Sequence, residues 1–446
     1  MDLTSARVLV VGMARSGMAL AEWLVARGIA VTACDAKPAA GLGETGARLE
    51  SLSIPLIAQE GDIGRGFDLV VLSPGVPPQI PQLDGARDRG TPIYGDVEVA
   101  SWFLRGPILG ITGSNGKTTS TALCGHLLQA SGIRVQVGGN IGNPVSAMID
   151  SSREDQWNVL ELSSFQLETS YSLRPKIGVA LNVTPDHLDR HGTLEAYAAA
   201  KARLFRNQQP GDWAVLNAAD PVTKAWVSAG QGEVRWFSTE GKVEHGMWTD
   251  NVHLLADGSA FLRVDEIPLR GRHNIENVLA CAAAAQLAGA SLDQIRTGVM
   301  SFKAVEHRLE YVRTVNGVAW FNDSKATNVD STLKAIESFP QGLWVILGGK
   351  DKNSDYTVLR EPLRRRARGV LLIGAAAAKI SSHLGGVVRE IHAGTLDNAV
   401  QEAHRAATPS DTVLLAPACA SFDQFRSYEH RGQVFKQLVM AIEEAA

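Results

Sequence analysis

Cysteine is scarce in the sequence, and its positions argue against metal or disulfide chemistry. The four cysteines, Cys34, Cys124, Cys281 and Cys419, are widely separated and form no Cys-x-x-Cys pair. Zinc sites and disulfide frameworks need paired or closely spaced cysteines, so neither is expected to organise the fold. The cysteine usage therefore predicts a protein of the reducing cytoplasm.

Long hydrophobic runs and blocks of one charge are also missing. No apolar run approaches the length that crosses a bilayer, and the segment before Arg7 lacks the charged and apolar regions of a signal peptide. The formal net charge is -4, and the nearest approach to a basic patch, at residues 364–368, is typical of a solvated helix face. We therefore expect neither a membrane nor a nucleic acid as partner.

The sequence does contain enough apolar material for several cores. Of its 446 residues, 45% are hydrophobic and 20% are charged, which is ordinary for globular domains. At roughly 100 to 200 residues per domain, three domains are expected, and alternating strand-like and helical segments predict the α/β class. We expect a Rossmann-like nucleotide-binding domain at 1–96, a central P-loop ATPase-like domain with a mostly parallel sheet and a small β region at 97–302, and a C-terminal Rossmann-like domain at 303–446.

The stretch at 107–130 predicts a phosphate-binding loop. An apolar run at 108–111 is typical of a buried strand, and leucines recur at helical spacing after the glycines. Between them, Gly-Ser-Asn-Gly-Lys-Thr-Thr at 113–119 supplies glycines that let the backbone wrap an anion, and Lys117 would reach the β and γ phosphates. The strict pattern requires glycine at Ile111, so this loop is a variant.

The N-terminal stretch predicts a Rossmann-like unit. A continuous apolar strand at 7–11 runs into a glycine turn at 12–17, and a second strand ends at Asp35. In such units the turn receives phosphates and the acidic residue binds a ribose or a base. The dinucleotide fingerprint would need glycine where the chain has Ala14, so a nucleotide other than NAD is favoured.

Two later regions have their own patterns. Between residues 233 and 270, short alternating runs with an Asp257-Gly258 turn signal predict a small antiparallel hairpin region. Beyond Phe302, four strand-like runs alternate with helical segments, which indicates a third α/β unit.

Polar residues in and after two predicted strands are candidates for metal binding. Glu161 lies within an otherwise apolar strand, where either Mg²⁺ on bound phosphates or a buried arginine would have to supply its partner. His187 alone would more often be an ordinary hydrogen-bonded histidine. With Glu161 and a phosphate loop in the same domain, a metal role is favoured for both, since phosphoryl transfer needs cations, and the hydroxyl of Thr118 would face the ion.

Seven motifs follow one another in the order of a known family. The first four are Gly-Ser-Asn-Gly-Lys-Thr-Thr at 113–119, Glu-Leu-Ser-Ser-Phe-Gln-Leu-Glu at 161–168, Asn-Val-Thr-Pro-Asp-His-Leu-Asp-Arg-His at 182–191 and Gly-Arg-His-Asn-Ile-Glu-Asn at 271–277. Together they resemble the Mur ligase family of peptidoglycan precursor synthesis. Three more, at 321–328, 347–352 and 417–425, resemble the members of that family that add D-glutamate.

The resemblance implies an ATP-driven amide bond. In such ligases the γ-phosphate passes to the carboxylate of UDP-N-acetylmuramoyl-L-alanine, and the amine of D-glutamate then attacks the acyl phosphate. The implied cofactors are ATP and two Mg²⁺ ions, with Thr118, Glu161, His187 and Lys201 as metal-binding residues. Lys201 matches a position that is carbamylated in the family, although sequence alone would make it a solvated helix lysine. The implied catalytic residues are Lys117, Glu161, His187 and Lys201.

The resemblance also implies three sets of binding residues. ATP would contact Gly113, Ser114, Asn115, Gly116, Lys117, Thr118, Thr119, Asn274, Asn277, Arg308, Asp323 and Lys325. The UDP substrate would contact Arg15, Ser16, Asp35, Lys37, Ser73, Gly75, Asn140, Gln166 and His187. D-glutamate would contact Thr327, Lys352, Ser421 and Phe422. Ala36 departs from the hydroxyl often seen at its position, which affects the expected uracil contact.

Two alternatives stay open at this point. One is another member of the superfamily, such as the L-alanine-adding or the folate polyglutamate enzyme, but the motif at 323–328 favours D-glutamate addition. The other is a nucleotide-sensing binding module, or a dehydrogenase built on residues 1–96, which would not consume ATP. The imperfect dinucleotide fingerprint counts against it. We expect a monomeric, cytoplasmic ligase.

Overall fold

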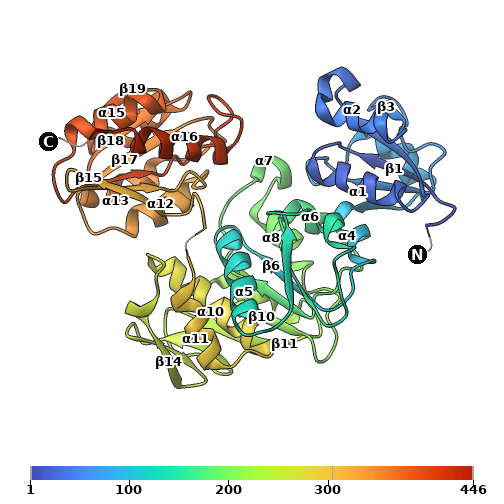
Figure 1. Ribbon diagram of the computed structural model, residues 1–446, viewed down its shortest axis with the longest axis horizontal. Coiled ribbons are helices and arrows are strands. Elements are labelled where there is room, and N and C mark those ends of the chain that lie inside the picture. The colour runs from blue at the N-terminus through green and yellow to red at the C-terminus, as the bar shows by residue number, and fades with distance from the viewer. Residues whose placement is uncertain (1–2, 304, 444–446) are drawn as a thin grey trace. The chain divides into compact units, whose positions relative to one another are not determined.

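Three β-sheets with flanking helices make up the structure, a computed structural model that describes residues 3–303 and 305–443 (Figure 1). The sheets are mostly parallel, which confirms the predicted α/β class. The chain divides into two compact units, one of Met1–Glu266 with Glu276–Met300 and one of Ile267–Ile275 with Ser301–Ala446. The first unit contains two of the sheets. The domain boundaries proposed at 96 and 302 stay predictions.

The first sheet is fully parallel, with strand order β3-β2-β1-β4-β5. Its strands are β1 (Arg7–Val11), β2 (Ala30–Asp35), β3 (Leu56–Ala58), β4 (Leu69–Leu72) and β5 (Ile93–Gly95). Its helices are α1 (Arg15–Val25), α2 (Glu44–Ser51), α3 (Asp84–Asp88) and α4 (Asp96–Ser101). The order reverses between β1 and β4, and ligands of open α/β sheets bind at the carboxyl ends of strands at such a reversal.

The second sheet has nine strands in the order β14-β13-β12-β11-β10-β9-β6-β8-β7. They are β6 (Ile108–Thr112), β7 (Val135–Gly139), β8 (Trp157–Glu161), β9 (Ile177–Ala180), β10 (Trp213–Asn217), β11 (Glu233–Ser238), β12 (Gly246–Thr249), β13 (His253–Ala256) and β14 (Ser259–Arg263). The predicted antiparallel region is confirmed for β12 to β14, whereas β11 pairs in parallel with both of its neighbours.

Helices of residues 117–301 accompany this sheet. They are α5 (Lys117–Ala130), α6 (Ser164–Glu168), α7 (Leu188–His191), α8 (Leu194–Ala202), α9 (Pro221–Lys224), α10 (Arg272–Leu287) and α11 (Leu292–Ser301). Several helices begin where a side-chain oxygen accepts a hydrogen bond from the first turn, as Ser163 does for α6 and Thr193 for α8. Helix α5 instead begins after Gly116, whose φ of 84° is in the left-handed region.

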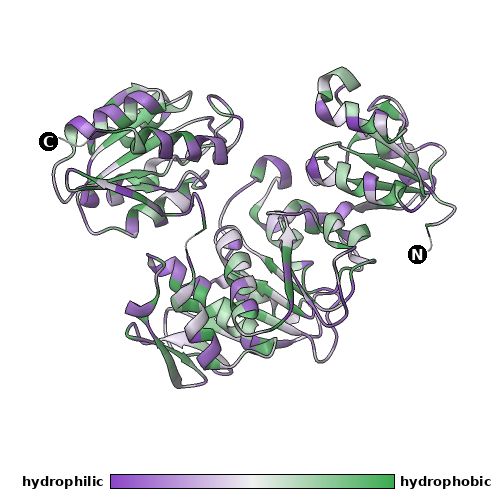
Figure 2. Cartoon of the chain, viewed as in Figure 1, coloured by the Kyte–Doolittle hydropathy of each residue, from purple (hydrophilic) through white to green (hydrophobic). Residues whose placement is uncertain are grey.

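The third sheet has strand order β15-β16-β20-β17-β18-β19 and is parallel except for the β15–β16 pair. Its strands are β15 (Glu310–Val315), β16 (Val318–Asn322), β17 (Leu343–Gly348), β18 (Ala367–Ile373), β19 (Arg389–Gly394) and β20 (Thr412–Leu415). Its helices are α12 (Val329–Glu337), α13 (Arg360–Arg366), α14 (Ala377–Leu384), α15 (Leu396–Ala406) and α16 (Tyr428–Met440). Hydrophobic residues are concentrated in the strands (Figure 2).

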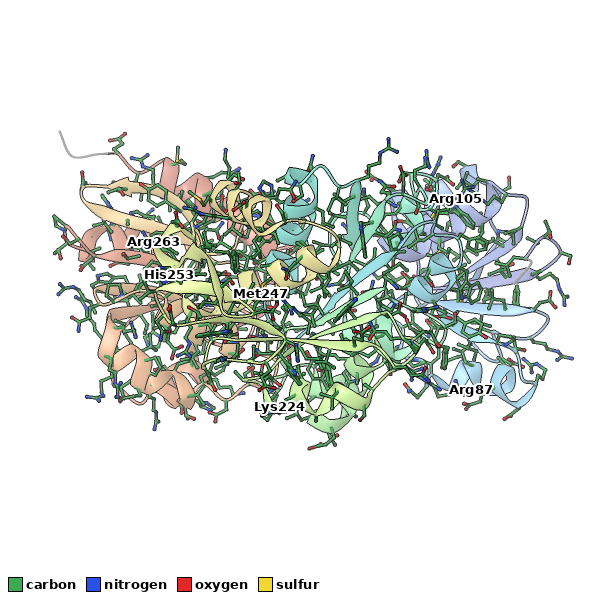
Figure 3. All side chains as sticks on the ribbon, turned by 90° about the horizontal axis from the view of Figure 1, so that it is seen from below. Arg87, Arg105, Lys224, Met247, His253 and Arg263 are labelled. Carbon is green, nitrogen blue, oxygen red and sulfur yellow. The ribbon has the colours of Figure 1, made fainter. Side chains whose placement is uncertain are left out.

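The surface agrees with the charge pattern of the sequence. The basic stretch at 364–368 lies on α13 and β18, where Glu361 pairs with Arg364 and Arg365. Charged residues elsewhere, such as Lys224 and Arg263, are exposed, and Arg263 pairs with Asp265 (Figure 3). Among the described residues, none of the helices combines the length and the hydropathy that a bilayer span requires.

Candidate active site

The predicted phosphate loop connects β6 to α5, and two of its carbonyl oxygens accept hydrogen bonds from the lysine at the start of α5. The ammonium of Lys117 donates hydrogen bonds to the carbonyl oxygens of Gly113 at 2.7 Å and Ser114 at 2.8 Å. A Cβ atom added to Gly116 would lie 2.4 Å from the side-chain oxygen of Asn277, so only glycine fits at this turn. The loop therefore presents the N-terminus of α5 to an anion.

The segment that follows β9 fixes the conformation of this loop. The Asn115 amide donates to the side-chain oxygen of Asn182 at 2.9 Å, and the Ser114 amide donates to the Asn182 carbonyl at 2.8 Å. The Thr184 amide donates to the Ser114 hydroxyl at 2.9 Å. Because this segment leads directly to His187, the loop and the histidine are held by one hydrogen-bonded unit.

Glu161 ends β8 as a buried carboxylate that the protein satisfies only in part. It is 2% exposed, and its Oε1 accepts a hydrogen bond from the side-chain amide of Asn140 at 2.8 Å. Its Oε2 is buried and has no hydrogen-bond partner among the described residues. The structure thus shows an asparagine and not the buried arginine that was the alternative. An unpartnered carboxylate oxygen in such a place suits a cation, so the residues fit Mg²⁺.

His187 lies at the start of α7 with a left-handed backbone, at φ 53°. Its ring is 4.8 Å from that of Phe165, centroid to centroid, and its Nε2 is 3.7 Å from a carboxylate oxygen of Asp186. About a third of the side chain is exposed. An imidazole held in this way can bind a metal ion or a phosphate oxygen that approaches from solvent.

Lys201 is the main departure from the expectation that sequence alone supports. It lies on α8 and is 1% exposed, so it is not a solvated lysine. Its ammonium donates to the Gly113 carbonyl at 2.8 Å and lies 4.5 Å from the centre of the Tyr197 ring. Burial, assisted by the nearby charge of Lys117, lowers the pKa of Lys201 well below its ordinary value, although Asp186 and Glu161 oppose the shift. The neutral amine is therefore accessible here.

Two residues without an assigned role belong to this group. The hydroxyl of Tyr197 lies 3.2 Å from that of Ser114, and burial raises the pKa of Tyr197. Asp186 is close enough to oppose the pKa shift of Lys201. Each of them had one local signal in the sequence. Tyr197 precedes Lys201 by one helical turn, and Asp186 directly precedes His187, so each lies next to a residue that was already a candidate.

The residues proposed for the UDP substrate gather mainly at the carboxyl ends of β1, β2 and β4. Asp35 accepts hydrogen bonds from the amides of Met13 at 2.7 Å and Lys37 at 2.9 Å. The Ser73 hydroxyl donates to the Gly12 carbonyl at 2.5 Å, which joins the first turn to the end of β4. Arg15 and Ser16 begin α1 above this turn, and Gly75 follows Ser73.

Two further residues proposed for that substrate have structural partners in the second sheet. The Asn140 amide bonds to Glu161, as described above. Gln166 caps α6, because its side-chain oxygen accepts a hydrogen bond from the Ser163 amide at 3.0 Å.

The second compact unit places its candidate residues after neighbouring parallel strands. Asp323, Lys325 and Thr327 follow β16, Lys352 follows β17, and Ser421 and Phe422 follow β20. These strands run in the order β16-β20-β17, so their carboxyl ends form one edge. Asp323 is buried, its Oδ1 has no hydrogen-bond partner among the described residues, and burial raises its pKa to about 6.

The remaining predicted residues are distributed as follows. The ammonium of Lys325 lies 5.2 Å from the centre of the Tyr428 ring, and Ser421 is buried. Phe422 is 68% exposed and Lys352 is exposed. The side-chain amide of Asn274 donates to the Arg270 carbonyl at 2.6 Å.

Three family models match most of the chain. They are the MurD-like N-terminal domain of Mur ligases at residues 6–95, the Mur ligase middle domain at 111–285 and the Mur ligase glutamate ligase domain at 307–419. A protein of Solibacter usitatus is 57% identical over 443 residues, which cover 99% of each chain. The chain belongs to the Mur ligase family. Mur ligases use ATP, and Mg²⁺ is general for such ligases.

The named relatives of this Mur ligase are similar along their whole length. The Solibacter usitatus protein is named UDP-N-acetylmuramoylalanine--D-glutamate ligase, as is a protein of Acidobacterium capsulatum that is 51% identical over 462 residues, with 100% and 98% of the two chains covered. This match favours a ligase over the dehydrogenase or nucleotide-sensing alternatives, and it confirms the resemblance.

Solved structures share the fold of this Mur ligase. A pseudomurein peptide ligase type C of Methanothermus fervidus has a TM-score of 0.63 at 19% identity and covers 98% of this chain and 100% of its own. The UDP-N-acetylmuramate-alanine ligase MurC of Thermotoga maritima has a TM-score of 0.63 at 20% identity, with 98% and 99% covered. At these identities the likeness concerns the fold alone.

Proposed function

We propose that the chain is an ATP-dependent ligase that joins D-glutamate to UDP-N-acetylmuramoyl-L-alanine in peptidoglycan precursor synthesis. One observation carries the proposal: relatives 57%, 51% and 49% identical over essentially their full length are named for this reaction. The site supports it, since a phosphate loop, a part-satisfied buried carboxylate and a buried lysine lie within one group of contacts.

The reaction passes through an acyl phosphate. The carboxylate of the alanyl group attacks the γ-phosphorus of ATP, and ADP leaves. The amine of D-glutamate then attacks the carbonyl carbon, loses a proton and expels phosphate. Lys117 and the amides at the start of α5 stabilise charge on the transferring phosphoryl group. Mg²⁺, when bound, neutralises phosphate charge, and Thr118, Glu161, His187 and Lys201 are the residues that would hold the two ions.

We propose that Lys201 does so as a carbamate. The neutral amine attacks carbon dioxide, a proton leaves the nitrogen, and the side chain changes from a cation into an anion. The burial of Lys201 and its lowered pKa support this step, because only the unprotonated amine is nucleophilic. The change would also replace the like-charge contact with Lys117 by an attractive one.

The finer assignments belong to the same proposal. ATP is bound by 113–119 together with Asn274, Asn277, Arg308, Asp323 and Lys325. The UDP substrate is bound mainly by residues of the first sheet, and D-glutamate by Thr327, Lys352, Ser421 and Phe422. The domains are residues 1–96, 97–302 and 303–446. The enzyme is a cytoplasmic monomer, and its four free, buried cysteines are consistent with a reducing compartment.

Phosphate release from ATP tests the function directly. The assay contains UDP-N-acetylmuramoyl-L-alanine and D-glutamate, and it is repeated with each component omitted and with L-glutamate, L-alanine or glycine in place of D-glutamate. Release that needs both substrates, with a product heavier by one glutamyl residue, is the expected result. Release with another amino acid would assign the chain to another reaction of the family, and release with none would contradict the proposal.

A further inference from the structure

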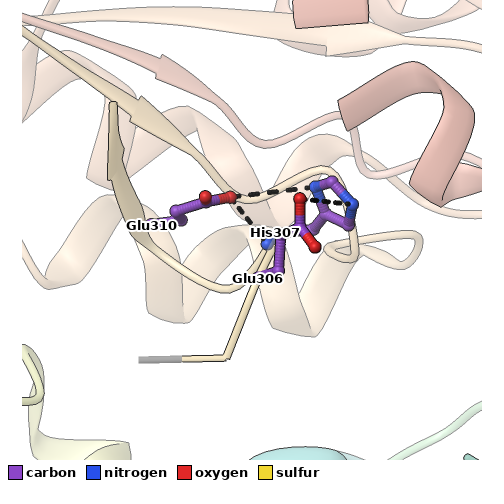
Figure 4. A group of neighbouring side chains, drawn as sticks. All are labelled: Glu306, His307 and Glu310. Carbon is purple, nitrogen blue, oxygen red and sulfur yellow. Dashed lines mark hydrogen bonds and ion pairs between the residues drawn. The ribbon is translucent and has the colours of Figure 1, made fainter. Parts of the chain in front are cut away.

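Glu306, His307 and Glu310 form a cluster whose composition suits a metal ion, but the protein supplies a cation of its own. One ligand atom from each residue lies within 4.8 Å of the others (Figure 4). The ammonium of Lys436, on α16, donates to Glu306 Oε1 at 2.8 Å and to Glu310 Oε1 at 2.6 Å. The two carboxylates therefore share one ammonium of the protein itself, and the cluster is an internal ion network.

Arg308 belongs to the same turn of the chain and lies between two residues with left-handed backbone. His307 has a φ of 64° and Leu309 a φ of 40°. Among residues other than glycine, such angles are commonest for asparagine, aspartate and histidine and rare for leucine, so the backbone of Leu309 persists only because its surroundings hold it. The position of Arg308 between these two residues therefore depends on the contacts that hold the turn.

Several contacts hold the turn from the side of β16 and α16. Glu310 Oε2 accepts hydrogen bonds from the His307 amide at 2.9 Å and from the Asn322 amide group at 3.1 Å. His307 is 3% exposed, and a Cβ atom added to Gly432 would lie 2.3 Å from its Nδ1, so the helix backbone touches the ring. Lys436 follows Gly432 by one turn of α16, which places both contacts on one helix face.

One hydrogen-bond donor of the Arg308 guanidinium is unsatisfied within the part of the chain that the structure describes. Its Nε is buried and has no hydrogen-bond partner among the described residues. Arg308 is separated by one residue on either side from Glu306 and Glu310, the two carboxylates that Lys436 occupies. The charge of Arg308 instead acts on Asp323, where it opposes the rise in pKa that burial causes.

We propose that Lys436 is a positioning residue for Arg308. By pairing with Glu306 and with Glu310, which itself holds the His307 amide, it fixes the turn that carries Arg308. This inference rests on the proposed function, in which Arg308 contacts ATP. The network thus connects α16 to the nucleotide through side chains that do not themselves touch it.

Steady-state kinetics of Lys436→Met, Lys436→Arg and a matched control test this role. Arg405→Met removes an exposed ion pair with Glu402 on α15 of the same sheet, away from the turn. We expect Lys436→Met to raise the KM for ATP about tenfold, with the KM for the UDP substrate unchanged, and Lys436→Arg and Arg405→Met to stay within about twofold of wild type. Adding Glu306→Gln to Lys436→Met should restore part of the affinity, because one of the two carboxylates that lose the ammonium of Lys436 is then uncharged.

The kinetics and a binding measurement together distinguish a failure of the positioning role from a failure of the proposed function. An unchanged KM for ATP in Lys436→Met, or an equal rise of every KM together with a lower Tm, would overturn the positioning role. Calorimetric titration with a magnesium complex of a non-hydrolysable ATP analogue reports nucleotide affinity without turnover. If the wild type binds the analogue, and Lys436→Met binds it more weakly, but neither forms product, the proposed function fails while the positioning role stands.

Discussion

The ammonium groups of Lys117 and Lys201 donate hydrogen bonds to the same acceptor, the carbonyl oxygen of Gly113, at 2.7 and 2.8 Å. Two like charges on one oxygen repel each other, and burial disfavours the charged form of either amine. Lys201 is the more buried of the two, and its pKa is lowered well below the ordinary value, first by burial and then by Lys117. Lys201 is therefore the amine of this pair whose neutral form the structure favours.

Replacement of Lys201 should remove most of the activity in a way that a small carboxylate can reverse. We expect Lys201→Ala to lower kcat by about a hundredfold or more, because an anion that supports the metal is lost. Added formate or acetate should restore part of the rate by occupying the vacated volume. Lys224→Ala, at an exposed position on α9, should behave like wild type.

A carbon-13 signal provides the direct check on the same residue. Wild-type protein in labelled bicarbonate should show a carbamate resonance that Lys201→Ala lacks. Carbamate formation should increase as pH rises, because the amine must first lose its proton. A fully active wild type in carbon dioxide-free buffer would contradict this prediction.

Neutralising Glu161 should weaken the use of magnesium. Glu161→Gln keeps the shape of the side chain but removes the charge of the oxygen that has no partner among the described residues. We expect the Mg²⁺ concentration needed for half-maximal activity to rise about tenfold or more. Glu154→Gln, at an exposed position, is the control. Equal magnesium dependence of Glu161→Gln and wild type would exclude a metal role.

Asp96 should make the protein less stable as pH rises. It is 5% exposed at the start of α4, and burial, opposed by a hydrogen bond with Ser16, raises its pKa from the ordinary value of 3.8 to about 6. The folded state therefore binds more protons than the unfolded state between these values, so stability falls as pH increases through them. Asp96→Asn removes this penalty, which amounts to about 3 kcal/mol at most.

Denaturant unfolding at a series of pH values measures this effect. Asp96→Asn should be more stable than wild type at pH 7.5, and the difference should vanish below about pH 4, where both side chains are neutral. Asp88→Asn, which is exposed, should show no such trend. A difference that does not depend on pH would mean that the substitution acts through packing and not through ionisation.

Lys352 should contribute to the affinity for D-glutamate. The substrate brings two carboxylates, and the exposed Lys352 makes no ion pair among the described residues. We expect Lys352→Met to raise the KM for D-glutamate by roughly tenfold or more and to leave the KM for ATP unchanged. Lys350→Met, two residues away and also exposed, serves as the control. Equal effects of the two variants would indicate a general loss of positive charge.

Local patterns predicted the elements that hold the phosphate loop. The apolar run at 108–111 forms most of β6, and the leucines at helical spacing lie on α5. Both were predictable because a buried strand needs a continuous apolar run and a buried helix face needs apolar residues at helical spacing. The hairpin prediction was correct for β12 to β14 and wrong for β11. Alternation alone does not distinguish a strand that pairs in parallel from one in a hairpin.

Lys201 shows where sequence patterns end. Helix α8 is rich in alanine, so it has no clear polar face from which the burial of one lysine could be inferred. The burial comes from the approach of Gly113, 88 positions earlier in the chain. Likewise, the pairing of Lys436 with Glu306 spans 130 positions, and the residues next to either of them do not predict it.

The sequence by itself therefore determined the α/β class, the phosphate loop and the motifs of the Mur ligases, because each depends on neighbouring residues and their spacing. Only the tertiary structure decided that Lys201 is buried against a second lysine, that Glu161 keeps an oxygen without a partner among the described residues, and that Lys436 occupies the carboxylates around Arg308. These features arise from distant segments packed together, and desolvation and charge depend on that packing, not on order along the chain.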